Sequence, residues 1–402
     1  PEKLDLMQRV AAKIVRATNR EDNAKVEQYT DRKSALEGAD FITVTINVGG
    51  TKAAYLDNEI PLRHGILQTV GDTVGPGGMM RAFRHVPIMM DIAKVVERFA
   101  PEAYIFNYSN PLTPLVRVAL RETKAKTYGL CTGIIGFKNG LADYMGVSRD
   151  SVELYVGGIN HFYWATSLNI QGKPLYPMIE DLIRKGDVPP EGEGAIVAML
   201  YKIFGLMPGP GGRHVVEFLP RVFMNEEAMK QYGIPIFPEG TTSDLKARKP
   251  FEDLLTAVAT GSRTVDELMK DKGMEEEGIG VVNLMESLVL DKPILFPGIN
   301  VTNKGCIGNL PPWSVVEVPA YVDSAGIRPL QVGDLPQAIA GVTTQRIMQY
   351  EVTIDAALTG DRNLALQALL LDGYVDGVVK AEKLLNEMLE AEKDWLPSYW
   401  FK

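Results

Sequence analysis

The sequence predicts an α/β fold, in which a parallel sheet is followed by a helix-rich α+β part. From residue 38 to about 150, apolar β-branched runs alternate with helical periodicity, which is typical of βαβ units with right-handed crossovers. After residue 150, strand-like segments give way to helices divided by Pro/Gly loops. A chain of 402 residues is long enough for two domains at roughly 100–200 residues each, and we expect them at 1–160 and 161–402.

The first predicted domain opens with a helix and continues with three strands. Apolar residues at helical spacing mark the opening helix: Leu4, Met7, Val10, Ala11 and Ile14. The apolar runs 41–48, 103–109 and 127–131 read as buried parallel strands. Residues 79–99 have helical periodicity, which Pro87 is expected to kink or break.

The second predicted domain is mixed. Residues 152–160 and 161–170 read as sheet strands, and the runs near 292–322 read as two more before three closing helices. The Pro/Gly-rich loop 207–213 and the charged stretch 241–250 are the best candidates for linkers.

Composition narrows the classes of partner. Forty-two basic against 51 acidic residues give a net charge of -9, so nucleic acid and anionic membranes are not expected partners. No stretch approaches the ~18 apolar residues of a membrane helix, and no signal peptide is visible. Two cysteines cannot form a disulfide framework, so a reducing compartment, the cytoplasm, is the expected location.

Candidate site residues follow the predicted strands, because ligands of open parallel sheets bind beyond the carboxyl ends of the strands. Gly49 and Gly50, the segment 107–111, and Cys131 occupy those positions. The glycines, with the loop 75–78 before the next helix, could let a backbone approach a phosphate. The fingerprint G-x-G-x-x-G is absent, which argues against a complete Rossmann domain in this chain.

Other side chains leave alternatives open. Cys131 and His161 suit a divalent transition metal, but their spacing equally fits a buried cysteine and a core histidine. His214 and Glu217 would share a helical face, either for acid–base work or as a solvated pair. Arg81 and Arg84 would also share a helical face, either as an anion-binding site or as an ordinary solvent-exposed face.

A series of segments, in order, resembles glycoside hydrolase family 4, the NAD- and manganese-dependent glycosidases, in its α-glucosidase and α-galactosidase branch. The matching segments are GADFITVTINVGG (38–50), HGILQTVGDTVGPGGMMRAFRHVP (64–87), NYSNPL (107–112), GLC (129–131), GGINHFYW (157–164), GRHVVEFLP (212–220), GNLPPWSVVEVPAYVDSAGIRPL (308–330) and DWLP (394–397). The resemblance implies a Rossmann-like first domain of the lactate/malate dehydrogenase type. Family members begin with a strand, a G-x-G-S loop, a helix and a second strand, so we expect about 30 further residues upstream of Pro1.

The resemblance implies a redox mechanism instead of a pair of carboxylates. Hydride leaves C3 of the sugar for NAD, a base removes the C2 proton, the leaving group is eliminated, water adds, and the hydride returns. A divalent metal, Mn²⁺ in the family, polarises the sugar oxygens. The expected partner is a small sugar glycoside, and the expected assembly is a homodimer or homotetramer.

The resemblance also implies roles for individual residues. Cys131 and His161 are the expected metal ligands, and the acid–base candidates are Asp72, His214 and Glu217. The expected substrate contacts are Arg84, Asn110, Asn160 and Arg213, and the expected cofactor contacts are Asn47, Gly49, Gly50 and Asn107.

One position departs from the family pattern. The residue after the metal cysteine is commonly histidine in this branch and aspartate in the phosphosugar branch, but here it is Thr132, which cannot serve as an acid near neutral pH. Arg213, Arg81 and Arg84 raise a further hypothesis of an anionic sugar, a uronide or a sulfoquinovoside, as in related NAD-dependent sulfoquinovosidases. Two other functions remain open, an NAD-dependent 2-hydroxy-acid dehydrogenase and a non-enzymatic sugar sensor.

Overall fold

A computed structural model describes residues 2–187, 192–237, 239–270 and 279–402. Within those ranges ten strands form one sheet, whose main path runs β1-β2-β3-β8-β9-β4-β5-β6. The strands are β1 (Phe41–Val44), β2 (Tyr104–Asn107), β3 (Lys126–Gly129), β4 (Val152–Ile159), β5 (Phe162–Ile170), β6 (Lys173–Pro174), β7 (Pro208–Gly209), β8 (Ile294–Thr302), β9 (Val315–Asp323) and β10 (Gly326–Pro329). The predicted α/β class is confirmed, and the sheet is mixed.

The parallel part of the sheet consists of β1, β2 and β3, paired in register from Phe41 opposite Tyr104 and from Tyr104 opposite Lys126. All three predicted strands of the first domain are present, each shorter than its apolar run. Their carboxyl ends, at residues 44, 107 and 129, therefore lie at one edge. The segments that follow these ends are brought together there.

The antiparallel part joins the two halves of the chain. β8 and β9, both from the second half, pair with each other, and β8 continues the sheet from β3 through Gly129 and Asn300. The predicted boundary at residue 160 falls in the turn of the β4–β5 hairpin, whose strands pair from Val152 opposite Ile170 to Ile159 opposite Phe162. Sequence periodicity does not reveal this continuity, because strand pairing is a tertiary property.

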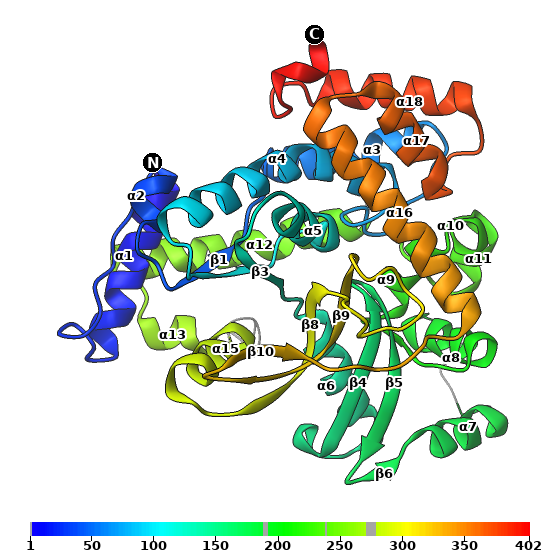
Figure 1. Cartoon of the computed structure of the whole chain (residues 1–402), viewed down its shortest axis with the longest axis horizontal. Helices are drawn as coiled ribbons and strands as arrows, with labels where there is room; N and C mark the ends of the chain where they lie inside the picture. The colour runs from blue at the N-terminus through cyan, green and yellow to red at the C-terminus, as the bar shows by residue number, and fades with distance from the viewer. Residues whose placement is uncertain (1, 188–191, 238, 271–278) are drawn as a thin grey trace.

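The helices cover the sheet and extend beyond it (Figure 1). The helices of the first half are α1 (Glu2–Ala17), α2 (Arg32–Leu36), α3 (Gly50–Arg63), α4 (Gly75–Phe99), α5 (Leu112–Glu122) and α6 (Gly133–Met145). Those that follow are α7 (Tyr176–Lys185), α8 (Gly192–Phe204), α9 (Gly212–Val215), α10 (Pro220–Phe223), α11 (Glu226–Gln231), α12 (Glu239–Thr260), α13 (Val265–Met269) and α15 (Ile279–Leu290). The three predicted closing helices are α16 (Gln337–Thr359), α17 (Arg362–Asp372) and α18 (Val378–Ala391).

The closing helices pack on the first half of the chain, in orange and red beside the blue α3 and the blue-to-cyan α4 in Figure 1. One buried cluster contains residues of α4 together with residues of α16, α17 and α18. Within it, the rings of Phe83 and Trp400 lie 4.5 Å apart. The C-terminal segment is therefore part of the core that supports the carboxyl ends of β1 and β2.

Three local predictions require correction. Helix α4 continues through Pro87, so the expected break does not occur, and buried neighbours such as Val86 and Met89 hold the segment in place. The charged stretch 241–250 lies inside α12 and is no linker. The loop 207–213 is no linker either, since Pro208 and Gly209 pair with β5 as strand β7.

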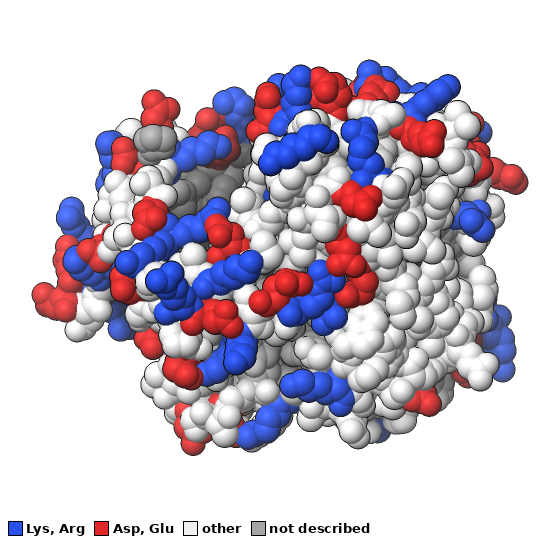
Figure 2. Space-filling model, turned by 45° about the horizontal axis from the view of Figure 1, so that its top comes forward, with Lys and Arg blue, Asp and Glu red and all other residues white. Residues whose placement is uncertain are grey.

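Charge is mixed on the surface. On the face shown in Figure 2, basic and acidic side chains are interspersed over the left and upper parts, and the right-hand side is largely uncharged. Among the described helices, none combines the length and apolarity needed to cross a bilayer.

Candidate active site

The loops after β1 and β2 are tied together by Asn107 and Ser109. The amide of Asn107 donates to the carbonyl of Ser109 (3.0 Å), and its Oδ1 accepts the N–H of Ser109 (3.1 Å). The Ser109 hydroxyl in turn accepts the N–H of Ile46 from the β1 loop (2.6 Å). Because Asn107 is fully buried in this turn, its side chain supports the loop and is not free to contact a cofactor, contrary to the expectation.

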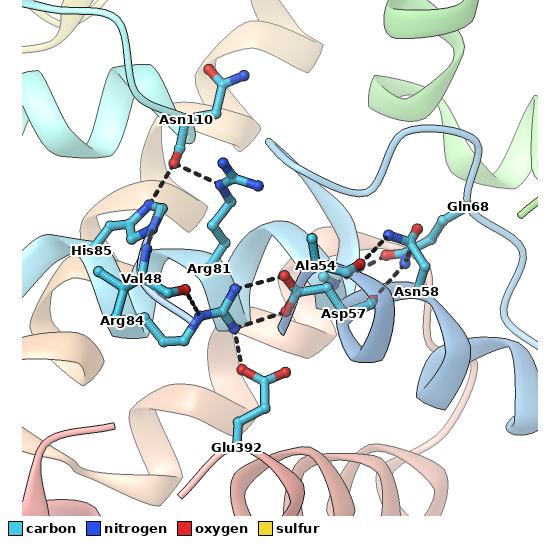
Figure 3. Close-up of polar contacts among 11 residues, drawn as sticks. Val48, Ala54, Asp57, Asn58, Gln68, Arg81, Arg84, His85, Asn110 and Glu392 are labelled. Atoms are coloured by element: carbon cyan, nitrogen blue, oxygen red, sulfur yellow. Dashed lines mark hydrogen bonds and ion pairs between the residues drawn. The ribbon is translucent and has the colours of Figure 1, made fainter. Parts of the chain in front are cut away.

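Helix α4 connects the same two loops through His85 and Arg81 (Figure 3). Nε2 of His85 accepts the N–H of Val48 (2.9 Å), and Nδ1 lies 2.8 Å from the carbonyl of Asn110. Arg81 Nε donates to that carbonyl too (3.0 Å). An imidazole that accepts at Nε2 and donates at Nδ1 is neutral. Burial, with Arg81 nearby, lowers the pKa of His85 to about 3, in agreement with this role.

Arg84 does not face a substrate, which corrects the prediction of a sugar contact. Its side chain is 1% exposed, and Nη1 and Nη2 donate to both carboxylate oxygens of Asp57, at 2.9 and 2.6 Å. It also bonds Glu392, which follows α18, and the carbonyl of Val48 (Figure 3). The guanidinium is thus committed to joining α3, α4 and the C-terminal segment.

Gly49 and Gly50 form the start of α3, where the N–H groups of the first helical turn are available to an anion. Their φ angles are 81° and 58°, a region that favours glycine. A Cβ on Gly49 would lie 2.5 Å from Cβ of Ala53 and 2.9 Å from the ring of Trp395. Asn47 is exposed, and its carbonyl accepts the N–H of Gly50 (3.1 Å). These features fit the pyrophosphate of a dinucleotide at a helix N-terminus.

The glycines of 75–78, at the start of α4, serve packing instead. Gly77 donates its N–H to the side chain of Gln68 (3.1 Å), and a Cβ there would lie 2.6 Å from two backbone oxygens. All four residues are buried. The anion site that the sequence raised at this loop is therefore not supported.

Cys131 follows β3, and His161 lies at the β4–β5 turn with a φ of 64°. The side chain of Asn160, the residue before His161, hydrogen-bonds the Cys131 side chain, so Cys131 and His161 lie in the same region of the structure. Burial raises the pKa of the Cys131 thiol to about 12, with Glu317 adding to the shift, so a thiolate there needs a cation beside it. Burial lowers the pKa of His161 to about 3, which keeps the ring neutral.

This donor set fits a divalent transition metal. A neutral imidazole and a thiol that ionises beside a cation are suitable ligands, and Oδ1 of the adjoining Asn160 is buried without a hydrogen-bond partner. Among the described residues, no group of three or more His, Cys, Asp and Glu side chains could hold a metal. A site with two protein ligands would leave positions open for substrate oxygens.

Asp72 is held ionised at the centre of the site. Thr73 Oγ1 donates to Oδ1 of Asp72 (2.6 Å), and the amide of Asn110 donates to Oδ2 (2.8 Å). Burial works to raise the pKa of Asp72, but neighbouring groups, His161 and Arg81 first, lower it to about 2. Asn110 therefore lies beside this carboxylate.

His214 lies beside His161, with the two rings 4.6 Å apart and nearly perpendicular. Burial lowers the pKa of His214, and the carboxylate of Asp72 opposes that shift. Arg213 donates from Nε and Nη2 to the hydroxyl (3.2 Å) and carbonyl (3.1 Å) of Thr69. A neutral imidazole near a fixed carboxylate can accept a proton, so His214 remains the acid–base candidate.

Glu217 is not placed for acid–base chemistry, which corrects the third acid–base candidate. Its Oε1 accepts the backbone N–H groups of Thr69 (3.0 Å), Val70 (2.8 Å) and Gly71 (3.0 Å), and the side chain is 2% exposed. Burial raises its pKa to about 7, while these bonds oppose the shift. Glu217 holds the loop that carries Asp72.

Sequence reasoning missed three residues that shape the site: Thr73, His85 and Glu317. Glu317 is fully buried in β9, opposite Asn300, and Asn160 Nδ2 donates to its Oε2 (3.4 Å). Burial raises its pKa to about 7. The position of Glu317 inside the apolar run 315–322 was an available signal, because a carboxylate is rarely buried without a partner.

An apolar cavity of about 370 Å³ adjoins the site. Helices α6, α7 and α8 line it together with Met207, Pro210 and Gly211. Pro210 packs against Gly133, next to Cys131, and Gly211 is the residue before α9, which carries His214.

Comparison with known proteins shows that this chain is a glycoside hydrolase. The family 4 glycosyl hydrolase model matches residues 1–147, and the model of the family 4 C-terminal domain matches residues 156–375. The chain belongs to glycosyl hydrolase family 4, which confirms the resemblance and does not favour the dehydrogenase alternative. The two models meet between residues 147 and 156, before the β4–β5 hairpin is complete.

Several relatives match over most of their length. An α-galactosidase of Bacillus subtilis is 31% identical over 380 residues, covering 93% of this chain and 85% of the relative. An α-galacturonidase of Lachnoclostridium phytofermentans is 31% identical over 415 residues, covering 95% and 86%. The crystal structure of Bacillus subtilis lplD superposes with a TM-score of 0.79 at 30% identity, covering 89% of this chain and 85% of that one.

A more distant structure shares the fold. The 6-phospho-β-glucosidase of Thermotoga maritima, crystallised with manganese, NAD⁺ and glucose-6-phosphate, has a TM-score of 0.80 at 24% identity and covers 98% of this chain and 90% of its own.

Proposed function

We propose that this chain hydrolyses an α-hexoside by oxidation, elimination, addition and reduction, with NAD and a divalent cation such as Mn²⁺. The single observation that carries the proposal is the cluster of Cys131, His161, Asp72 and His214 beyond the carboxyl edge of the sheet. When bound, NAD would supply the acceptor and donor of the sugar hydride, and the cation would supply a Lewis acid that makes the C2 proton of the oxidised sugar easier to remove.

The protein side chains perform the remaining work. Cys131 and His161 would hold the cation, and the N-terminus of α3 with Gly49 and Gly50 would hold the pyrophosphate. His214 would take the C2 proton as a neutral base, and Asp72 would stabilise the imidazolium that forms. Asn110 and Asn160 remain our candidates for contact with sugar hydroxyls.

The experiment follows deuterium into the product. The protein is incubated in D₂O with 4-nitrophenyl α-galactoside or α-glucoside, NAD, Mn²⁺ and a reductant, and the released sugar is examined by proton NMR. We expect deuterium at C2, because the base exchanges its proton with solvent, and we expect EDTA to stop the reaction. Hydrolysis without deuterium at C2, or undiminished by EDTA, would overturn the proposal.

A uronide is the second candidate substrate, favoured by Arg81 and Arg213. Among the residues that the structure describes, neither guanidinium forms an ion pair with a carboxylate, and both lie near the Asp72–His214 pair. A planar guanidinium suits a sugar carboxylate. The α-galacturonidase relatives are as similar to this chain as the α-galactosidase is. A panel of galactoside, glucoside, galacturonide and sulfoquinovoside decides between them by kcat/KM.

The leaving group is expected to be aryl. Thr132, the residue before α6, cannot protonate a glycosidic oxygen, so substrates whose leaving group needs no acid are favoured. The apolar cavity beside Pro210 and Gly211 provides a surface for such a ring. Faster hydrolysis of methyl than of 4-nitrophenyl glycoside would contradict this part of the proposal.

We also propose that the protein is a cytoplasmic homodimer or homotetramer. The reduced thiol that a metal ligand requires at Cys131 supports a reducing compartment. Exposed apolar side chains on α17 and α18, with Val379 65% exposed, support a contact between subunits. Light scattering coupled to size-exclusion chromatography measures the assembly, and a monomer would contradict it.

A further inference from the structure

The hydroxyl of Thr73 lies between a carboxylate and an imidazole. Its Oγ1 is 2.6 Å from Oδ1 of Asp72 and 3.1 Å from Nδ1 of His161. Thr73 is 3% exposed and His161 is 6% exposed, so water does not compete freely for these contacts. The three groups form a continuous line from Asp72 to the ring.

Counting protons along this line fixes the tautomer of His161. A hydroxyl has one hydrogen, and an ionised carboxylate only accepts. The short contact therefore takes the Thr73 hydrogen to Asp72. The hydroxyl oxygen must then accept from the imidazole, which places the His161 hydrogen on Nδ1 and leaves the lone pair on Nε2.

The surrounding structure holds this line in place. The amide of Asn110 donates to the second oxygen of Asp72 (2.8 Å), so the carboxylate cannot rotate freely. Glu217 accepts three successive N–H groups of residues 69–71, immediately before Asp72. Tyr374 donates to the carbonyl of Glu217 (3.0 Å), which connects this support to the segment after α17.

We propose that Asp72 and Thr73 are positioning residues that hold His161 as the Nδ1–H tautomer, with Nε2 presented to a divalent cation, and that Glu217 fixes the loop carrying them. The cation part rests on the proposed function, because it takes His161 as a metal ligand. Outer groups of this kind orient a ligand imidazole and raise its basicity, and their loss typically lowers metal affinity about 10–100-fold.

Nitrogen NMR reads the tautomer directly. The chain has four histidines, so ¹⁵N-histidine labelling gives few signals, and variants of the other three assign them. In the metal-free wild-type protein we expect His161 to show a protonated Nδ1 and an unprotonated Nε2. Thr73→Val should shift the ring toward the Nε2–H tautomer, and Thr73→Ser, which keeps the hydroxyl, should restore the wild-type signature.

Calorimetric titration with Mn²⁺ alone supplies the second readout. We expect Thr73→Val to weaken Mn²⁺ binding about 10–100-fold and Thr73→Ser to recover most of the affinity. The matched control is Thr113→Val, since Thr113 is a buried threonine whose hydroxyl has no hydrogen-bond partner. Its Mn²⁺ affinity and histidine signals should equal those of the wild type.

The results separate the two proposals. If wild-type protein binds no Mn²⁺, or binds it equally after Cys131→Ser, the proposed metal site fails while the tautomer is still measured. If Thr73→Val melts like the control yet keeps the Nδ1–H signature and the wild-type Mn²⁺ affinity, the positioning role is overturned. If Thr73→Val does not fold, the wild-type spectrum still decides, because an Nε2–H tautomer there would refute the inference.

Discussion

The ring of His214 stands nearly perpendicular to the ring of His161, with centroids 4.6 Å apart. Burial lowers the pKa of each ring, so both are neutral near pH 7. Two neutral imidazoles at this distance can take separate tasks, because a lone pair is available on each. His161 is our proposed metal ligand, and His214 is the proposed base.

Replacing His214 tests that division. We expect His214→Asn to lower kcat by about 10²–10⁴-fold, the usual contribution of a positioned base, and to leave Mn²⁺ affinity unchanged. Cys131→Ser, by contrast, should lower kcat and also weaken Mn²⁺ binding. His64→Asn is the control, since His64 lies in α3's C-terminal turn and bonds Glu387 (2.7 Å). An undiminished kcat in His214→Asn would remove the residue from the mechanism.

Arg213 tests the charge of the sugar. If the substrate is a uronide, Arg213→Met should raise KM for the galacturonide about tenfold or more, since a hydrogen bond to a charged group contributes roughly 1.5–3 kcal/mol. The KM for the neutral galactoside should change far less. Arg221→Met, an exposed arginine on α10, serves as the control. Equal increases in KM for both sugars would show that Arg213 does not recognise the carboxylate of the sugar.

Gly49 tests the cofactor loop, and Gly38 provides a matched control. Both have positive φ, 81° and 73°, so alanine costs roughly 1–2 kcal/mol of backbone strain at either position. Only at Gly49 would the new Cβ meet neighbours, Ala53 and Trp395, whereas Gly38 has none within 4 Å. We expect Gly49→Ala to weaken NAD binding, followed by tryptophan fluorescence, while Gly38→Ala binds NAD normally. Equal NAD affinity in both variants would argue against a role of the Gly49 loop in cofactor binding.

His85 predicts a pH dependence of stability. The pKa of His85 in the folded protein, about 3, lies below the usual 6.5, so between these pH values the unfolded chain binds a proton that the folded chain does not bind. The contribution of His85 to the unfolding free energy is therefore complete above pH 6.5 and falls by ~1.4 kcal/mol per pH unit as the pH drops toward 3. His85→Gln can keep both hydrogen bonds without titrating, so urea unfolding should show a flatter curve. Parallel curves for the two proteins would contradict this prediction.

Filling the apolar cavity tests the leaving-group site. Val197→Trp, on the α8 wall, should raise KM for a 4-nitrophenyl glycoside while leaving KM for the methyl glycoside nearly unchanged. The contrast isolates the aromatic ring, because the two substrates share the sugar. Exposed Ile203, also on α8, offers the control Ile203→Trp outside the cavity. A cavity variant that treats both substrates as the wild type does would exclude this location.

Several elements could be predicted because their signals are local. The runs 41–48, 103–109 and 127–131 contain β1, β2 and β3, since continuous apolar β-branched segments suit a buried strand. Gly49 and Gly50 were recognisable because glycine is the residue for a positive φ at a helix start. From residue type alone, Cys131 and His161 could be recognised only as two possible metal ligands. The family resemblance is what assigned them to one site.

Other features could not be read from the chain, because their partners are distant in sequence. Arg84 was expected at the sugar, yet its charge is matched by Glu392, which lies 308 residues away. Glu217 was expected to move protons, yet it accepts N–H groups about 146 residues away. In both cases the residue type indicated a charged or polar role, and only the neighbours distinguish catalysis from support.

By itself the sequence determined the fold class, the family and the strand ends from which the site is built, because apolar periodicity and short motifs are local. Only the tertiary structure decided which polar groups are consumed by the scaffold and which face the site. The physical reason is burial: a carboxylate or guanidinium removed from water must find partners wherever the fold supplies them, as Arg84 and Glu217 do. What remains, around Asp72, His161 and His214, is the chemistry available to a substrate.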